Sequence, residues 1–353
     1  MNFNWTANRK EKATLGNQVA VGGVEDTTPE AGCKQNTNFA RMGKRQHKKI
    51  RKKGLPPGSL VYTGHRSDVS ASTRTIWYDE ADYREQPGYV PKLRDAPSGT
   101  FWADVCGLTD TALVERIGSD LQLHHLALED VLNTQQRSKL EEYDQILFFI
   151  LHNLRYDAEN RELVSEQIAV FLGERFVVSF QENPDDTFQS VRKRAEEGLG
   201  RLRKKNADYL CYALLDTVVD NYYLVLDDIE NALNDLETEL HNNGTHPDQK
   251  ARIFDLKRTI LHFRRHLMPL RDAAIRLYRS ETPLIYDANR LYLRDLTDHV
   301  TQILDGIDNY RELLAGVEAL YQAEVGNRLN NVMRLLTIIS TIFIPLSFIA
   351  GVY

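Results

Sequence analysis

A row of small, polar and apolar side chains lies on one face of the helix predicted at the end of the chain. Side chains three or four residues apart share a helix face, and those on this face are Asn330, Met333, Leu336, Ser340, Ile344, Ser347 and Gly351. Amide and hydroxyl groups within an apolar helix should meet other helices or water rather than lipid. A ring of Asn330 amides can coordinate a hydrated cation, and Met333 can form an apolar constriction. Composition alone leaves two interpretations open, helix–helix packing and the lining of a pore.

Carboxylates earlier in the chain offer a second kind of chemistry. The candidates are Glu129 and Asp130 at the end of a short predicted helix, and Asp216, Asp220, Asp227, Asp228 and Asp295 on long ones. Hard divalent cations such as magnesium prefer carboxylate and water oxygens and keep much of their hydration shell. Carboxylates from different helices or subunits could therefore hold such an ion, although any single one is more often a solvated surface acid.

Other motifs point away from catalysis. His262 and His266 have a spacing that can chelate zinc, but Arg264 and Arg265 lie between them and disfavour a cation. The sequence has no phosphate-binding Walker loop, no GxGxxG after a strand, no GxSxG elbow and no HExxH. These patterns mark the common enzyme classes, so the chain is predicted not to be an enzyme.

The helix that carries the polar row is the one candidate membrane segment. Residues 335–353 form a run of 19 residues without charge, long enough to cross most of a bilayer core. The run continues into the last residue, so we expect the chain to stop inside its first membrane span. Arg328 and Arg334 precede it and place residues 1–334 in the cytoplasm by the positive-inside rule. Three cysteines without a CxxC pair fit a reducing compartment.

The elements that must position these groups are an α/β part and then long helices. Strands are expected at 59–63, 73–78, 100–105, 145–155, 167–172 and 175–181, with helices at 109–118, 124–132, 184–204, 207–241, 248–280 and 288–353. Gly173 and Glu174 fit a hairpin turn, and Thr109 and Asp110 offer a helix N-cap. The last helix, if continuous for 66 residues, would be about 99 Å long and is expected to be a stalk.

Charge is segregated between two of these helices. Residues 216–240 carry eight acids and no Lys or Arg, whereas the next helix begins with a basic stretch from Lys250 to Arg265. This pattern suggests an antiparallel pair held partly by complementary charge. Exposed pairs contribute only about 0–1 kcal/mol each, so two solvated faces remain the alternative.

Length and composition limit the classes of protein to which the chain can belong. The chain has 353 residues, 42% hydrophobic, with a net charge of −6, which allows a sizeable core and argues against a general nucleic-acid binder. We expect a disordered basic tail at 1–53, an α/β domain at 54–204, long helices and stalk at 205–334, and the start of a membrane helix at 335–353. The basic run at 41–53 is either a solvated tail or attracted to anionic lipid or an acidic partner.

The sequence resembles the CorA-type magnesium channels, also called the metal ion transporter family, over nearly everything after residue 50. The segments that carry the resemblance are GLPPGSLVYTG (54–64), HHLALEDVLNTQQRSKLEEYDQILFFIL (124–151), SEQIAVFLGERFVVSFQE (165–182), KKNADYLCYALLDTVVDNYY (204–223), MPLRDAAIRLYR (268–279) and NNVMRLLTIISTIFIPLSFIAGVY (330–353). The last is highly specific, since family members continue directly from this tyrosine with a Gly-Met-Asn loop at the pore mouth. The family resemblance thus agrees with a chain that stops at Tyr353, one residue before that loop.

The resemblance implies an α+β fold and a homopentamer in the cell (inner) membrane. Each subunit would contribute an N-terminal α/β domain with a mixed sheet, a pair of long antiparallel helices and a very long stalk helix that enters the membrane. The polar row would line the pore. Magnesium, with cobalt or nickel as further cargo, would be both transported and regulatory, and no organic cofactor or nucleic acid is implied.

The resemblance also implies cytoplasmic magnesium sites that gate the pore. Asp130 matches a carboxylate between neighbouring N-terminal domains, and its partner on the adjacent stalk would fall at Ala319, next to Glu318. A second, weaker site would take Glu129, Asp216 and Asp295. Bound magnesium would hold the subunits in a closed state, and its loss would let the acids repel and the pore open.

Two alternatives are kept. The zinc-transporting branch of the same family shares the architecture. A protein of another class, a helical scaffold with a tail anchor, would use residues 335–353 only as a tether, and the polar row and long stalk disfavour it.

Overall fold

The structure is a computed structural model that describes residues 56–64, 70–183 and 186–352. The predicted tail at 1–53, with its basic run, lies outside the described residues. The domain boundaries predicted from the sequence stay a prediction.

A seven-stranded mixed sheet forms the N-terminal part, in the order β2-β1-β3-β7-β6-β5-β4. Its strands are β1 (Ser72–Tyr78), β2 (Tyr83–Pro87), β3 (Thr100–Cys106), β4 (Lys139–Tyr143), β5 (Ile146–Asp157), β6 (Glu162–Leu172) and β7 (Phe176–Gln181). Only β3 and β7 pair in parallel, and the other neighbours are antiparallel. The predicted mixed sheet is confirmed.

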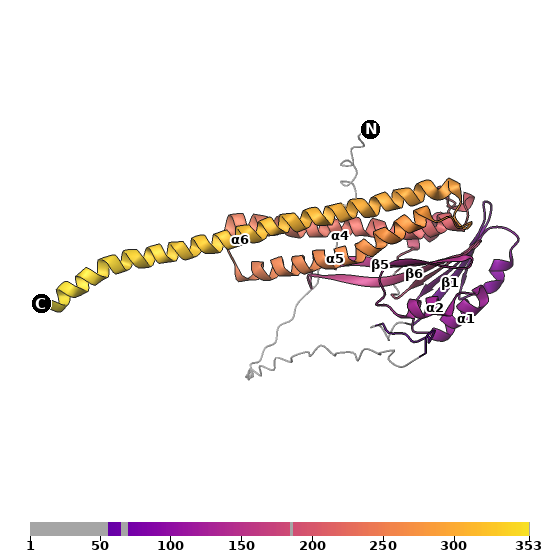
Figure 1. Cartoon of the computed structure of the whole chain (residues 1–353), viewed down its shortest axis with the longest axis horizontal. Coiled ribbons are helices and arrows are strands. Elements are labelled where there is room, and N and C mark those ends of the chain that lie inside the picture. The colour runs from indigo at the N-terminus through magenta and orange to yellow at the C-terminus, as the bar shows by residue number, and fades with distance from the viewer. Residues whose placement is uncertain (1–55, 65–69, 184–185, 353) are drawn as a thin grey trace, which may run out of the picture. The chain divides into compact units, whose positions relative to one another are not determined.

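The two faces of the sheet bury different helices, because successive strand side chains point to opposite faces. On β5, Phe148 and Ile150 join one core with α1 (Thr111–Leu121) and α2 (His125–Leu132). Phe149 and Leu151 belong to the other core, which the long helices complete. In Figure 1, α1 and α2 lie on one side of the sheet and the long helices on the other.

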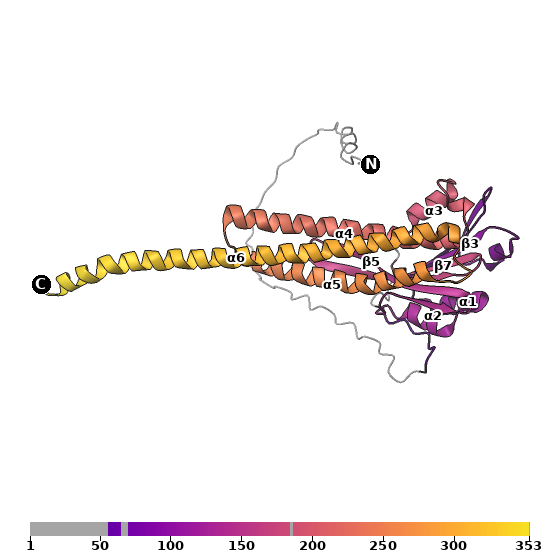
Figure 2. The same cartoon turned by 45° about the horizontal axis from the view of Figure 1, so that its top comes forward.

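Three long helices follow the sheet: α4 (Ala207–Asn243), α5 (Pro247–Arg279) and α6 (Arg290–Val352). α6 packs along both α4 and α5 and continues beyond their ends (Figures 1 and 2). Its first half buries an apolar stripe from Leu293 to Val317, spaced at three and four residues. At 63 residues it is about 95 Å long, which confirms the predicted stalk.

Short elements complete the chain. They are α3 (Gln189–Glu196) and the 3-10 turns η1 (Pro91–Asp95), η2 (Leu202–Lys204) and η3 (Asp287–Asn289). Asp110 caps α1 as predicted, its carboxylate accepting the N–H of Leu113 at 3.0 Å. The predicted hairpin turn at Gly173 and Glu174 also joins two antiparallel strands, β6 and β7.

Several predicted elements are wrong. Residues 59–63 form no strand, and Thr63 instead donates its N–H to the carbonyl of Leu132 at 3.0 Å. The helix predicted at 184–204 is reduced to α3 and η2, because Gly198 and Gly200 adopt positive φ angles that no α-helix contains. The edge strands β2 and β4 were missed, since their polar sequences lack the apolar alternation that marks a half-buried strand.

The predicted pairing of the acidic and basic helices is wrong in its main partner. Among the described residues, Arg252 and Glu239 make the one ion pair between α5 and α4. The basic side chains Lys257 and Arg264 instead reach Glu318 and Asp308 of α6, at 3.1 and 3.0 Å. Among the described residues, two of the three ion pairs that α5 makes with the other long helices therefore go to the stalk.

A buried histidine pair joins α5 to the sheet. His152 of β5 is 3% exposed, and its ring centre lies 4.6 Å from that of His266 on α5. Burial lowers the pKa of His152 to about 3 and that of His266 to about 4, the latter helped by the charge of His262. Both rings are therefore neutral at pH 7.

Acid should loosen this contact. Between about pH 6.5 and pH 4 the unfolded chain binds protons that the folded chain does not, so stability falls as the pH falls through this window. We expect a loss on the order of a few kcal/mol from pH 7 to pH 4, measured by chemical denaturation of the chain in detergent. His266→Leu should flatten this dependence, whereas His241→Leu, at an exposed position of α4, should not. An equal pH slope in His266→Leu would contradict the assignment.

Candidate metal centre

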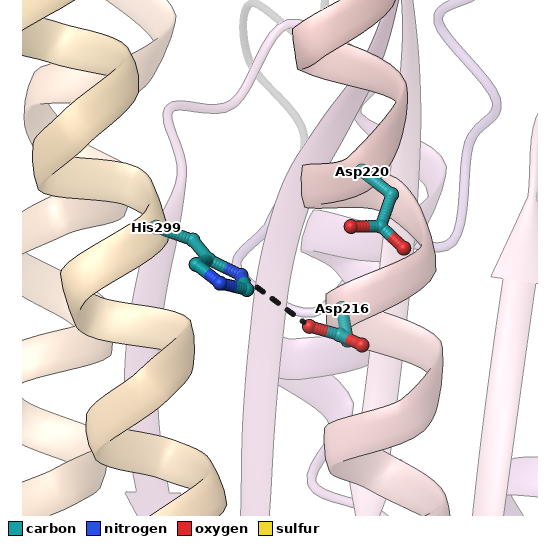
Figure 3. A group of neighbouring side chains, drawn as sticks. All are labelled: Asp216, Asp220 and His299. Atoms are coloured by element: carbon teal, nitrogen blue, oxygen red, sulfur yellow. Dashed lines mark ion pairs between the residues drawn. The ribbon is translucent and has the colours of Figure 1, made fainter. Parts of the chain in front are cut away.

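Two acids of α4 and one histidine of α6 form a compact group of metal-ligand type. Asp216 and Asp220 lie one turn apart, and His299 faces them from the neighbouring helix (Figure 3). One ligand atom from each residue lies within 4.8 Å of the others. The packing of α6 along α4 brings them together, because each is on the side of its helix that faces the other.

The group contains polar atoms that lack partners. Oδ1 of Asp216 and Nδ1 of His299 are both buried and have no hydrogen-bond partner in the described part of the chain. They lie 3.9 Å apart, too far for a hydrogen bond and close enough for an ion pair if His299 is protonated. Such orphaned buried atoms are costly unless a further group satisfies them.

The charge of the group is also unbalanced. Burial raises the pKa of Asp216 to about 6, and the neighbouring charge of Asp220 adds to the effect. Burial likewise raises the pKa of Asp220. The two carboxylates therefore resist being ionised together, and a bound cation would relieve that repulsion.

Asp295 adds a fourth side chain one turn before His299 on α6. Its Oδ2 lies 3.9 Å from Nε2 of His299 and is more exposed than Asp216. Asp216 and Asp295, which were predicted to share a site, thus lie on either side of one imidazole. His299 itself was not predicted, although its spacing from Asp295 was a signal in the sequence.

The donor set fits a divalent cation. Carboxylate oxygens with room for water suit magnesium, whereas an imidazole nitrogen suits cobalt, nickel or zinc. Asp216, Asp220 and Asp295 would supply the negative charge, and the orphaned Nδ1 of His299 would gain a partner. By charge and by donor type, the group could therefore hold a divalent cation.

Glu129, the third predicted member of this site, lies elsewhere in the chain. It belongs to α2, which covers the opposite face of the sheet from α4. Its Oε2 accepts the N–H of Gly58 at 2.6 Å. Within one chain it does not join Asp216 and Asp295.

Asp130 and Glu318 each form an ion pair with a lysine. Asp130 accepts from Lys139 at 2.7 Å and from the amide of Gln136. Glu318, on α6, pairs with Lys257 of α5 at 3.1 Å. The chain folds these two predicted ligands onto separate elements, α2 and α6, and pairs each with a lysine rather than with the other.

The predicted pore face lies wholly on the exposed half of α6. Asn330, Met333, Leu336, Ile344, Ser347 and Gly351 are exposed, and Ser340 is half-buried. The hydroxyls of Thr337 and Thr341 donate to carbonyls one turn earlier, at 2.9 and 2.8 Å, which satisfies them within the helix. Pro345 interrupts the helix ladder and borders a shallow groove shared with Leu336, Ser340 and Ile344.

α6 is also the one helix of the described residues that is long and apolar enough to cross a membrane. Its most apolar window has a mean hydropathy of 2.2 and is not buried against the rest of the chain. Apolar side chains such as Phe343 and Phe348 are 63% and 73% exposed there. This surface must be covered by lipid or by other helices.

Comparison with known proteins agrees with these features. The profile of a family described as CorA-like Mg²⁺ transporter protein matches residues 98–353. The cobalt/magnesium transport protein CorA of Thermotoga maritima is 39% identical over 309 residues, which cover 86% of each chain.

Two solved structures share the fold. The full-length CmaX protein aligns with a TM-score of 0.69 and 21% identity, over 80% of this chain and 86% of that one. The CorA magnesium transporter of Methanocaldococcus jannaschii aligns with a TM-score of 0.67 and 18% identity, over 81% of this chain and 86% of that one. Together with the family profile and the Thermotoga relative, they lead to one conclusion: the chain belongs to the family of CorA-like magnesium transporter proteins.

Proposed function

We propose that this chain is a subunit of a homopentameric divalent-cation channel in the cell (inner) membrane, with residues 1–334 in the cytoplasm. Magnesium would be the main cargo, with cobalt or nickel as further cargo. The cytoplasmic part would sense magnesium and gate the pore. Membership of a transporter family, rather than of an enzyme family, supports this proposal.

The single observation that carries the proposal is the division of α6 into two halves. The half up to Val317 is packed against α4 and α5, and the half after it presents an apolar surface with a polar row from Asn330 to Gly351. In a membrane, that polar row needs water or other helices beside it. Copies of α6 around a central axis would give it both and would enclose a water-filled path.

Gating would follow from repulsion among acids. Asp216, Asp220 and Asp295 lie close together around His299, and the pKa of Asp216 is already raised by burial and by its neighbour. Magnesium at this site would stabilise the arrangement of α4 against α6 that the structure has. A ligand shifts an equilibrium only by binding one state better than the other. Loss of magnesium would therefore weaken the α4–α6 contact and favour an open state.

The remaining predicted ligands would act between subunits. Glu129 and Asp130 lie on α2 and Glu318 lies on α6, so a neighbouring copy would supply their partners. Lys139 already neutralises Asp130 at 2.7 Å, and Lys257 neutralises Glu318 at 3.1 Å. A magnesium ion at either residue would have to compete with that lysine.

A second candidate is transport of zinc, as in the zinc-transporting branch of the family. The observation that favours it is His299, because imidazole binds zinc, cobalt and nickel better than it binds magnesium. The order in which these metals compete for uptake distinguishes the two. The tail-anchored scaffold is disfavoured by the same polar row on α6 that supports a pore.

The sensor can be tested on the purified chain in detergent. We expect a pentamer by light scattering, and millimolar magnesium should slow its cleavage by a protease severalfold, because the ion holds α4 against α6. The double variant Asp216→Asn, Asp295→Asn should lose this protection and keep the pentamer.

The matched control for this test is Asp298→Asn, on the same helix as Asp295. Asp298 is exposed, and its ion pair with Arg294 is long, at 3.9 Å, and also exposed. The loss of its carboxylate should therefore leave the protection by magnesium intact. Equal protection in the parent and in the double variant would refute the sensor.

The pore face can be tested by magnesium uptake in cells that express the full-length gene product. Asn330→Leu keeps the size of the side chain and removes the amide that would hold a hydrated cation, so uptake should fall at least tenfold. Val332→Leu, at an exposed position of α6 off the polar row, should leave uptake within twofold of the parent. Normal uptake in Asn330→Leu would exclude this face as the path.

A further inference from the structure

The segregation of charge between α4 and α5 is left mostly unused by contacts within one chain. Residues 216–240 of α4 carry eight acids and no Lys or Arg, whereas α5 has a basic stretch that ends at Arg265. Among the described residues, one ion pair, Arg252 with Glu239, joins the two helices. The other charges on their outer faces are therefore available to a partner.

The outer face of α4 combines acids with an exposed apolar side chain. Leu224, Asp227 and Asn231 follow one another at steps of three and four residues, so they share a face of the helix. All three are exposed, and Leu224 is 62% exposed. Glu237, about three turns beyond Leu224 and Asp227, is exposed as well. We call this surface the acidic face.

The outer face of α5 has the same pattern with the opposite charge. Phe254, Arg258, Leu261 and Arg265 recur at steps of four and three residues and share one face. The apolar members, Phe254 and Leu261, are 68% and 53% exposed. Both arginines are exposed too. We call this surface the basic face.

The charges of both faces lack counter-ions within one chain. Asp227 and Glu237 on α4, and Arg258 and Arg265 on α5, make no ion pair with any residue that the structure describes. Exposed charges of mixed sign are ordinary on a protein surface, but here each face carries one sign only. Two surfaces of opposite sign are complementary to each other.

The two faces lie on opposite flanks of the long helices. In Figure 2, α6 lies between α4 and α5, and α6 packs along both of them. Phe263 is on the other side of α5 from Leu261 and Arg265, and its buried ring lies 5.8 Å from that of Tyr222 on α4. Tyr222 is likewise on the other side of α4 from Leu224. The acidic and basic faces therefore point away from each other.

The position of Asp227 along the molecule follows from the contacts of α4 with α6. These two helices run parallel, since their contacts advance along both in the same direction. Glu230 of α4 accepts a hydrogen bond from Tyr310 of α6 at 2.8 Å. Asp227 is three residues earlier, so it lies about 4.5 Å before Tyr310 along the axis, level with Ile307.

The position of Arg265 follows in the same way from the contacts of α5 with α6. Lys257 pairs with Glu318, and Arg264, later on α5, pairs with the earlier Asp308, so these helices run antiparallel. Arg265 comes one residue after Arg264 and lies about 1.5 Å before Asp308 along the axis. Its level is again that of residue 307. The acid of α4 and the arginine of α5 are thus at the same height on opposite flanks.

We propose that the acidic face of α4 in one copy packs against the basic face of α5 in the next copy of the ring. A cyclic oligomer has head-to-tail interfaces, in which two different surfaces of the chain meet. Rotation about an axis along α6 leaves heights unchanged, so Asp227 meets Arg265 of the partner subunit. This arrangement rests on the proposed homopentamer and names the surfaces through which it assembles.

The segregation of charge also disfavours other ways of pairing two copies. A two-fold contact through α4 would place acid against acid, and one through α5 would place arginine against arginine. In the head-to-tail contact, the exposed apolar side chains Leu224, Phe254 and Leu261 gain cover. The charges around them would fix the register of the contact.

The test is the oligomeric state of the full chain in detergent, measured by light scattering as the chain is diluted. Asp227→Arg places like charges at every contact of the ring, so the concentration at which half of the pentamer dissociates should rise at least tenfold. Arg265→Asp should have the same effect. The double variant Asp227→Arg, Arg265→Asp exchanges the two charges and should return that concentration to within threefold of the parent.

The matched control is Glu115→Arg on α1, which covers the opposite face of the sheet from the long helices. It is an equal change of charge at an exposed position and should leave dissociation unchanged. A parent pentamer whose double variant dissociates as readily as the single variants would show that these faces do not meet, and the homopentamer would stand. A parent chain that is monomeric at every concentration would overturn the homopentamer and this arrangement with it.

Discussion

One continuous helix with two different surroundings is the constraint on which the rest of the structure depends. The first half of α6 buries Leu293, Val300 and Ile307 against α4 and α5, and the second half has no such cover. Because the backbone hydrogen bonds run through both halves, a shift of the packed half along its neighbours also moves the exposed half. A ligand that moved the packed half would therefore need no other path to the exposed half than the helix itself.

The charges around α6 are arranged so that different partners hold different parts of it. Toward the exposed half, Arg264 and Lys257 of α5 bind Asp308 and Glu318 through ion pairs that need no metal. Near its start, the facing groups are Asp216 and His299, whose buried atoms remain unpaired. The contact of α6 with α5 is thus complete within one chain, whereas its contact with α4 has an unsatisfied polar centre. Under the proposed function, that asymmetry makes the α4–α6 contact the one that would respond to a bound cation.

The elements that could be predicted from the sequence are those with a regular spacing of apolar residues. The stalk, the two helices before it and the central strands follow from apolar periodicity and from breaks such as Gly244 and Pro247. The edge strands could not be predicted from apolar periodicity. β4 (KLEEY), for example, is polar and pairs with a neighbour on one side only. The candidate site was predicted in part: Asp216 and Asp295 lie on either side of His299, but His299 joins them only through the packing of α6 on α4. That packing depends on which helix neighbours which, and the charge pattern had favoured α5 as the partner of α4.

The most direct test of the metal centre is calorimetry of magnesium binding to the chain at pH 6 and at pH 8. Burial raises the pKa of Asp216 to about 6, and magnesium needs the carboxylate, so binding at pH 6 should release about half a proton per chain and at pH 8 almost none. The release is measured from the heats in two buffers that differ in ionisation enthalpy. Proton release that is the same at both pH values, or that persists in Asp216→Asn, would contradict magnesium binding at this centre.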